Sequence, residues 1–241
     1  MKKATLLTFC LLTIFASCKK INLAGYNESK TFTVNDFSKI EAHNDIHVSF
    51  CDSIDHIVAT TDANALPHLK VDKQGQTLKF SYPSGILVNF STEILVPFRN
   101  GLNKVALSGS SSFVSAKSIE TDNLEMDLSG ASSVTGDFII SNGKLDIDAS
   151  GASTLALKGF AKSVDVDFSG ASKITASKAD DSYAFGSDEL DGNLSGGSSI
   201  QIHCNDMIDC DLSGSSTIHY TGNADTSHCK CSGGSNVVHE N

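Results

Sequence analysis

Leu124-Glu-Met-Asp-Leu-Ser-Gly-Ala-Ser-Ser-Val134 is the stretch that decides the fold, because its pattern returns along most of the chain. Apolar and polar residues alternate, Ser-Gly and a small residue with Ser follow, and an apolar residue ends the phrase. Seven copies lie between Asn103 and Val238, with glycines separated by 21, 21, 19, 26, 18 and 19 residues. A period near 20 residues is typical of proteins that stack one supersecondary unit on the next. The repeat glycines are Gly109, Gly130, Gly151, Gly170, Gly196, Gly214 and Gly233.

Alignment on these glycines produces columns of apolar side chains. The residues two and four before the glycine are apolar and alternate with polar ones, the pattern of a strand with one buried face. Another apolar column four residues after the glycine starts a second strand, so each repeat turns a corner at Ser-Gly, where glycine reaches positive φ without a Cβ clash. Parallel crossovers are almost always right-handed. We therefore predict an all-β fold whose residues 101–241 form a right-handed parallel β-helix, a β-solenoid of seven Ser-Gly repeats.

Acidic residues fill the outward positions three and five before the glycine. In-register stacking would place them roughly 4.8 Å apart, where like charges repel unless water or cations screen them. Two adjacent ladders could offer oxygens to Ca²⁺, the one cofactor that we consider, or could form a merely solvated acidic face. The candidate cation-binding ladder consists of Asp127, Asp146, Asp148, Asp165, Asp167, Asp209 and Asp211. The serines two after each glycine are expected to form hydrogen bonds at the corners rather than to contact a ligand.

The N-terminus resembles a bacterial lipoprotein signal. Lys2 and Lys3 precede an apolar stretch over residues 4–15, and Ala16-Ser17-Cys18 follows. We predict a signal peptide over residues 1–17 and a lipid attached to Cys18; an ordinary secretory signal with an incidental cysteine is the alternative. The apolar stretch is too short for a stable membrane span. A protein of this kind is held at the membrane by its lipid, and durable anchoring takes more than one acyl chain.

Residues 18–100 do not follow the repeat. Residues 18–30 are expected to be a tether between the lipid and the fold, and residues 31–100 an all-β segment packed on the first rung of the repeats, where it could shield an exposed edge. The predicted elements are strands over residues 31–34, 46–50, 56–60, 78–82 and 93–96, a helical turn within 62–69 and a hairpin at 73–76.

Five cysteines remain beyond the leader, and three of them lie in the predicted inward columns: Cys210, Cys229 and Cys231. Three interpretations stay open for them. They could be buried free thiols, a Cys210–Cys229 disulfide formed in an oxidising envelope, or part of a metal site with a nearby histidine. No C-x-x-C pair is present, so we expect no metal site.

Composition narrows the functional classes. The formal net charge is −10 and Arg99 is the one arginine, which argues against nucleic-acid binding. The absence of tryptophan weakens the hypothesis of an aromatic platform that binds sugars.

The longest glycine spacing inserts Lys178–Glu189, and insertions in repeat proteins often lie on the binding face. Asp181, Tyr183 and Phe185 are the candidate ligand contacts of this loop, although a bulge without a role is the alternative.

The combination of features resembles a known family. The lipoprotein-type leader, the opening Phe32-Thr-Val-Asn-Asp-Phe-Ser-Lys-Ile40 and the iterated Leu-Ser-Gly-Ala-Ser at residues 128–132 are similar to the putative auto-transporter adhesin, head GIN domain family. The resemblance covers about residues 31–240. It implies a β-helical envelope protein of Bacteroidetes-like bacteria and brings no agreed catalytic residues. Lys19-Lys20 replaces the acidic cluster that such bacteria often use for surface export, so surface-exposed and periplasm-facing orientations both stay open.

We therefore expect a non-catalytic, lipid-anchored outer-membrane protein of the cell envelope that binds a glycan or a protein of the envelope or host. The alternatives are a structural scaffold without a specific ligand and a β-helical enzyme that acts on polysaccharides. A catalytic pair among Asp146, Asp148, Asp165 and Asp167 should break the repeat, whereas the aspartates follow it. The sequence does not decide the ligand, the oligomeric state or the orientation at the membrane.

Overall fold

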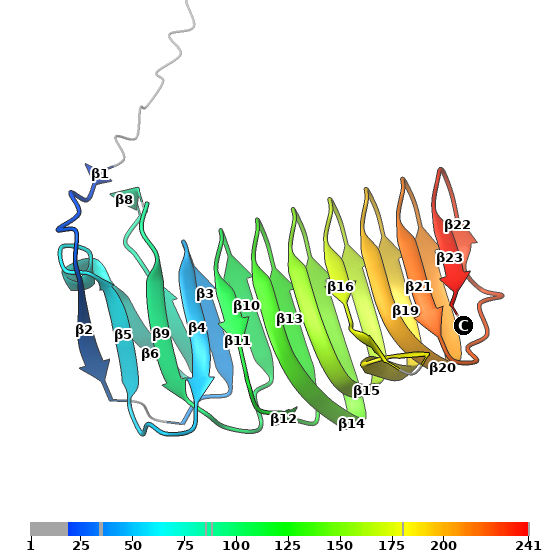
Figure 1. Ribbon diagram of the computed structural model, residues 1–241, viewed down its shortest axis with the longest axis horizontal. Helices are drawn as coiled ribbons and strands as arrows, with labels where there is room; N and C mark the ends of the chain where they lie inside the picture. The colour runs from blue at the N-terminus through cyan, green and yellow to red at the C-terminus, as the bar shows by residue number, and fades with distance from the viewer. Residues whose placement is uncertain (1–18, 34–35, 85, 88, 180, 241) are drawn as a thin grey trace, which may run out of the picture.

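The computed structural model describes residues 19–33, 36–84, 86–87, 89–179 and 181–240. The described chain is all-β, with one 3-10 helix and no α-helix. Figure 1 shows it as an elongated row of strands that runs from the N-terminal to the C-terminal end. None of its described helices is long and apolar enough to cross a membrane. The predicted signal peptide and the lipid attachment at Cys18 lie outside the described residues.

Two groups of strands follow the chain. The first consists of β1 (Lys19–Lys20), β2 (Asn27–Phe32), β3 (Lys39–His43), β4 (Ile46–Cys51), β5 (Ile57–Asp62), the 3-10 helix η1 (Leu66–His68), β6 (Lys70–Gln74), β7 (Thr77–Ser81), β8 (Ile86–Leu87) and β9 (Thr92–Pro97). The repeats contain β10 (Lys104–Ser108), β11 (Ser112–Val114), β12 (Ile119–Glu120), β13 (Leu124–Leu128), β14 (Ser133–Ala149), β15 (Thr154–Phe168), β16 (Lys173–Thr175), β17 (Lys178–Ala179), β18 (Ser182–Tyr183), β19 (Phe185–Leu194), β20 (Ser199–Leu212), β21 (Thr217–Thr221), β22 (Lys230–Cys231) and β23 (Asn236–His239).

Each repeat forms one rung, which we define as the strands on both sides of one Ser-Gly corner. Successive rungs pair in parallel and in register: Met126 lies beside Ile147, and Ile147 lies beside Val166. Beyond the corner, Phe113 lies beside Val134, which lies beside Leu155. The predicted columns are therefore real rows of neighbouring side chains.

The corner glycines allow the rungs to approach closely. Gly130 has a φ of 76°, and a Cβ on it would lie 2.6 Å from the carbonyl oxygen of Gly109 in the preceding rung. That carbonyl instead accepts a hydrogen bond from the Ala131 N–H at 2.7 Å. The corner serines are buried, and each hydroxyl donates to the carbonyl of the serine three residues earlier at 2.7–3.0 Å, which confirms their structural role; they are Ser132, Ser153, Ser172, Ser198, Ser216 and Ser235.

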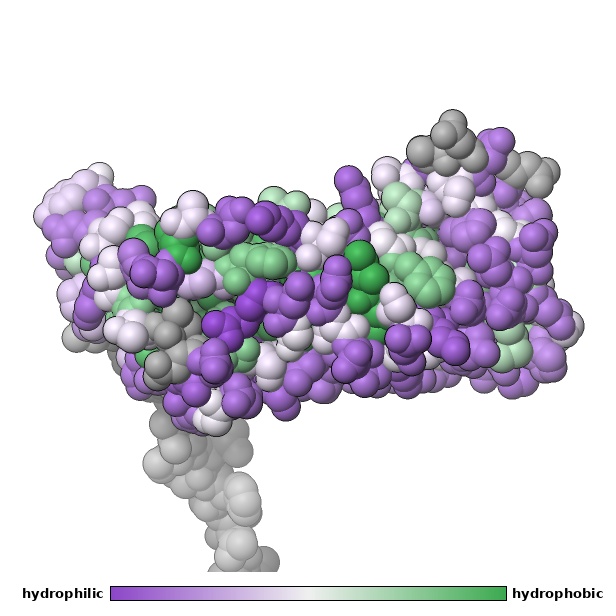
Figure 2. All heavy atoms as spheres, turned by 90° about the horizontal axis from the view of Figure 1, so that it is seen from below, coloured by the Kyte–Doolittle hydropathy of each residue, from purple (hydrophilic) through white to green (hydrophobic). Residues whose placement is uncertain are grey.

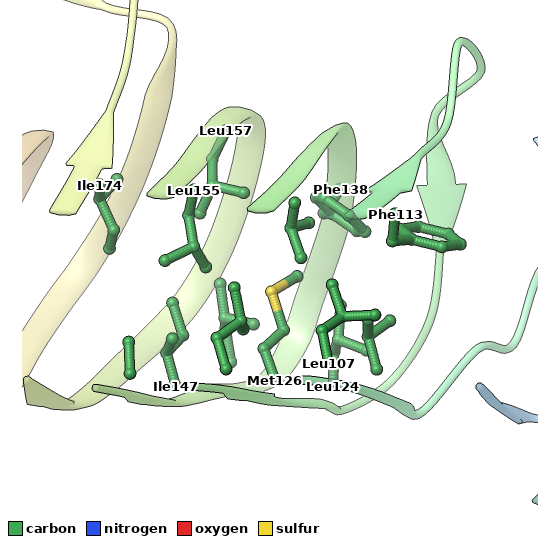
Figure 3. Close-up of a cluster of buried hydrophobic side chains, with 14 of the residues drawn as sticks. Leu107, Phe113, Leu124, Met126, Phe138, Ile147, Leu155, Leu157 and Ile174 are labelled. Atoms are coloured by element: carbon green, nitrogen blue, oxygen red, sulfur yellow. The ribbon is translucent and has the colours of Figure 1, made fainter. Parts of the chain in front are cut away.

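The inward columns make one continuous hydrophobic core along the described stack. In the close-up of Figure 3, Phe113, Phe138, Leu155 and Ile174 lie in the upper part of the interior, and Met126 and Ile147 lie in the lower part. Almost all interior members of these columns are fully buried. Burying an aliphatic side chain stabilises a fold by about 1.5–3 kcal/mol, and no single rung could bury its apolar face alone.

The N-terminal segment continues the stack. Strand β3 pairs in parallel with β10, and β4 pairs in parallel with β11. Parallel pairing extends to β7 and β9, after which β5, β2 and β6 add antiparallel strands at the end. The helical turn appears as η1, and the predicted hairpin joins β6 to β7 at Gly75. The expected separate segment over residues 31–100 is thus a further set of rungs with an antiparallel cap.

The expected tether is partly built into this cap. Strand β2 pairs with β5 over six residues, and Ile21 is buried. The carboxylate of Asp62 accepts hydrogen bonds from the N–H groups of Ala24 and Gly25, both at 3.0 Å. Residues 21–30 therefore do not form a free linker, because their backbone groups have partners on the folded chain.

A candidate binding surface on the acidic face

The acidic face consists of two outward ladders whose members pair across the strands. One ladder passes through Asp127, Asp148, Asp167, Asn193 and Asp211, and the other passes through Glu125, Asp146, Asp165, Asp191 and Asp209. The register and outward direction of all seven predicted ladder residues are therefore as the sequence indicated.

Three lysines that the sequence reasoning missed neutralise parts of this face. Lys104 Nζ lies 2.8 Å from Glu125 and 2.6 Å from Asp127. Lys144 lies 2.8 Å from Asp165, and Lys230 lies 3.1 Å from Asp211. The alignment could have predicted the ion pair of Lys104, because Lys104 occupies the column of Glu125 one rung earlier.

The middle of the face keeps its charge. Within the described chain, no ion pair joins a lysine or arginine to Asp148. Its partial burial raises its pKa, and the neighbouring carboxylates of Asp127, Asp146 and Asp167 raise it further. The pKa of Asp191 is raised for the same reasons, burial first and then Asp209 and Asp165. Like charges at adjacent rungs disfavour the ionised form, so the centre of the acidic face holds excess negative potential.

A shallow groove follows the ladder beside the Ser-Gly corners. Its volume is about 520 Å³, and its lining includes a carboxylate and a serine from each of three successive rungs: Asp127 with Ser129, Asp148 with Ser150, and Asp167 with Ser169. His43 and Ser108 close its N-terminal end. A second groove of about 270 Å³ continues the same columns at Asn193 and Asp211. The face thus offers a linear array of acceptors and hydroxyl groups.

The carboxylates project side by side, and the described residues contain no group of three or more His, Cys, Asp or Glu arranged to hold a metal ion. Ordered calcium binding needs oxygens that converge on one point. We therefore derive no calcium chemistry from this face. Its oxygens are suited to hydrogen bonds and to electrostatic attraction of cationic groups.

The prediction that Tyr183 and Phe185 are exposed binding residues is wrong. Phe185 is fully buried because it lies beside Gly159 at the start of β19, within the stack. Tyr183 is 6% exposed, and its hydroxyl donates to Glu240 Oε2 at 2.7 Å. Asp181 is exposed, with a φ of 64°, between β17 and β18.

The insertion instead holds the C-terminal end. Glu240 receives the Tyr183 hydroxyl, lies 2.7 Å from His219 Nδ1 and lies 3.5 Å from Lys178 Nζ. These partners lower the pKa of Glu240, and burial beside this carboxylate raises the pKa of Tyr183 to about 12. The loop therefore stabilises the last rungs.

The described cysteines are free thiols. Cys210 is buried and burial raises its pKa, whereas Cys229 is half-buried. Cys231 lies beside Leu212 in the inward column but is exposed, because the described residues form no rung beyond it. The expectation of a buried Cys231 fails for this reason.

One side of the molecule is mostly hydrophilic. Figure 2 shows polar side chains over most of this side, with apolar surface gathered along its middle.

Comparison with known proteins shows a family match and several solved structures with a similar fold. The family model described as putative auto-transporter adhesin, head GIN domain, matches residues 36–224. No curated protein matches. A putative adhesin from Parabacteroides merdae is 20% identical, with a TM-score of 0.71 and coverage of 91% of this chain and 98% of that one. A putative lipid binding protein from Parabacteroides distasonis is 17% identical, with a TM-score of 0.68 and coverage of 92% and 99%. A putative adhesin from Bacteroides fragilis is 18% identical, with a TM-score of 0.67 and coverage of 92% and 97%. At these identities the likeness shows the fold alone.

Proposed function

We propose a function on the premise that this chain belongs to the putative auto-transporter adhesin, head GIN domain family. It is a lipid-anchored protein of the cell envelope that acts by binding, and the acidic face is its binding surface. The rungs wind as a right-handed parallel β-helix. The parallel, in-register pairing of successive rungs supports this winding, because parallel crossovers strongly favour the right hand.

The anchor is proposed from the leader. Acylated Cys18 would hold the chain at the outer membrane, and the first described strands lie at the cap end of the stack. The opposite end would then point away from the membrane. A Cys18→Ala variant should lose acylation and membrane retention but keep its fold; retention of this variant after a high-salt wash would contradict the anchor.

One observation carries the binding proposal: the uncompensated centre of the acidic face coincides with the groove. Asp148 lines that groove, has no basic ion-pair partner among the described residues and has a raised pKa. A fold keeps such like-charge repulsion at a cost, which a ligand with amine or hydroxyl groups would offset. A glycan or a protein of the envelope or host has this chemistry.

The test compares isosteric variants. Asp127→Asn, Asp148→Asn and Asp167→Asn together remove the charge of the groove and preserve its shape. Attachment of the purified protein to a panel of acidic, neutral and amino-substituted glycans and to envelope extracts should fall at least about tenfold, the effect of 1.4 kcal/mol. The matched control is Glu28→Gln with Asp72→Asn and Glu93→Gln, which removes three exposed charges from other strands. Attachment that is unchanged by the triple variant would favour the structural scaffold.

The same glycan panel addresses the polysaccharide-acting alternative. If the protein cleaves any glycan and the Asp167→Asn variant does not, the acidic face is catalytic and the binding proposal is wrong. Protease treatment of intact cells distinguishes the two orientations, because only a surface-exposed protein is lost before lysis.

A further inference from the structure

The corner between β3 and β4 departs from the repeat that governs the other rungs. Asn44-Asp45 replaces the Ser-Gly turn, and both residues have positive φ, 69° and 61°. His47 follows in a column that contains Ser112 and Ser133 in the next two rungs. Since repeated residues serve the stack, a reactive set is expected where the pattern breaks.

The break brings a serine, a histidine and an aspartate into line. Ser112 on β11 lies directly beside His47 on β4. Ser112 Oγ lies 2.7 Å from His47 Nδ1, and His47 Nε2 lies 3.1 Å from Asp45 Oδ1. Side chains of His47 and Asp45 are 29% and 39% exposed, so the set is open to small molecules.

The charge of Asp45 favours one direction for the serine–histidine contact when the imidazole is neutral. The Asp45 carboxylate lies beside Nε2, and an anion there favours the tautomer with the ring proton on Nε2. In this tautomer Nδ1 is an acceptor, and the Ser112 hydroxyl donates to it. This is the proton arrangement of a serine nucleophile with its base, with the roles of the two ring nitrogens exchanged.

We propose that Ser112 is a nucleophile for acyl transfer from small activated esters, with His47 as its general base and Asp45 as the positioning residue. Ser112 Oγ attacks the ester carbonyl carbon and its proton passes to His47 Nδ1. The bond from the carbonyl carbon to the leaving oxygen breaks, and that oxygen takes the proton from Nδ1. Water then attacks the acyl-serine by the reverse proton route, releases the carboxylic acid and restores the Ser112 hydroxyl.

A neighbouring pair lacks one part of this arrangement. Ser108 Oγ lies 2.6 Å from His43 Nδ1, but His43 Nε2 lies 3.8 Å from Glu41. Lys79 Nζ holds that carboxylate at 3.0 Å. The Glu41 carboxylate is therefore compensated by a cation and does not orient His43 closely, so we assign the reactivity to Ser112.

The experiment uses the full chain and a fluorophosphonate probe, which phosphonylates activated serines. Mass spectrometry of the labelled protein should place the adduct on Ser112. Its labelling rate should exceed that of Ser133, which occupies the same column without a histidine, by at least about 100-fold, the lower range of general-base assistance. Ser112→Ala and His47→Gln should abolish the label, whereas Ser133→Ala should retain it.

Asp45→Asn tests the positioning role at little risk to the fold, because asparagine tolerates the positive φ of this site. Its labelling rate should fall by at least about tenfold, with an unchanged melting temperature, and the pH profile should change with it. Absence of label, label on Ser108, or label that persists in a folded His47→Gln variant would each overturn the proposal. Binding by the acidic face is independent of this result, since the triple asparagine variant leaves Ser112 unchanged.

Discussion

The middle of the stack and its C-terminal end contain the same columns in different environments. Leu128 and Cys231 occupy one inward column, yet Leu128 is 3% exposed and Cys231 is exposed. Each interior rung has a neighbour on both sides, whereas β22 and β23 form the last described rung. Burial in this fold is therefore a property of the neighbouring rung as much as of the residue.

The outward columns show the same contrast in charge. Asp148 in the middle lies among carboxylates, whereas Asp211 near the end pairs with Lys230. The N-terminal end differs from both, because antiparallel β2, β5 and β6 close it. The interior rungs of the stack therefore share one packing arrangement, whereas each end has its own.

The largest effect should come from truncation within one column. Leu128→Ala removes a buried side chain between two rungs and should lower the free energy of unfolding by about 2–5 kcal/mol. Cys231→Ala, in the same column at the end, should change it by less than about 0.5 kcal/mol. Urea denaturation measures both. Equal effects would mean that the end rung is covered in solution.

A corner glycine and a glycine outside the corners should differ in the same way. Gly130 and Gly101 have nearly equal φ values, 76° and 75°, but only the Cβ at Gly130 meets a neighbouring carbonyl, since nothing lies within 4 Å of that position on Gly101. Alanine costs about 1–2 kcal/mol at either site through left-handed strain. Gly130→Ala should cost about 1–3 kcal/mol more, because the adjacent rung must move. A similar melting temperature for both variants would refute close packing at the corner.

The C-terminal rungs should loosen when the insertion loses its contact with them. Tyr183→Phe removes the hydroxyl that donates to Glu240. Hydrogen exchange of residues 236–240 should accelerate, while exchange in β15 stays unchanged. Glu240 has a lowered pKa, so its contribution is present above the ordinary value of 4.5 and is lost as pH falls through the lowered value. The wild-type and variant exchange rates should therefore converge in acid.

The smallest effect concerns charge in the middle of the acidic face. The raised pKa of Asp148 means that ionisation disfavours the folded state above this pKa, and that the penalty is lost as pH falls through the ordinary value of 3.8. Asp148→Asn should raise stability at pH 7 by a few tenths of a kcal/mol, since the site is largely exposed, and this gain should vanish well below the ordinary pKa. Asp211→Asn, which breaks the pair with Lys230, should not stabilise at either pH.

Sequence reasoning was most successful where one pattern recurs. Seven aligned copies were enough to place Asp127 outward and Leu128 inward, and to align Asp127 with Asp148. It was weakest where the pattern occurs once. Strand β3 was missed, although Ile40 and Ala42 are fully buried, because its polar alternation has no aligned neighbour in the sequence. Phe185 was assigned to an exposed loop because the glycine spacing places it within the insertion over Lys178–Glu189, whereas β19 already starts at Phe185.

The sequence by itself determined the period, the corners, the inward and outward columns and the acidic character of one face, because stacking repeats these local preferences at every rung. Only the tertiary structure decided which carboxylates form ion pairs with lysines, which end of the stack is capped and which residues of the inward columns are exposed. It also brought Asp45, His47 and Ser112 together, although His47 and Ser112 are 65 positions apart in the sequence. These outcomes depend on neighbours that are distant in sequence. The register in which two rungs pair sets the distances between their side chains, and the sequence of one repeat does not specify that register.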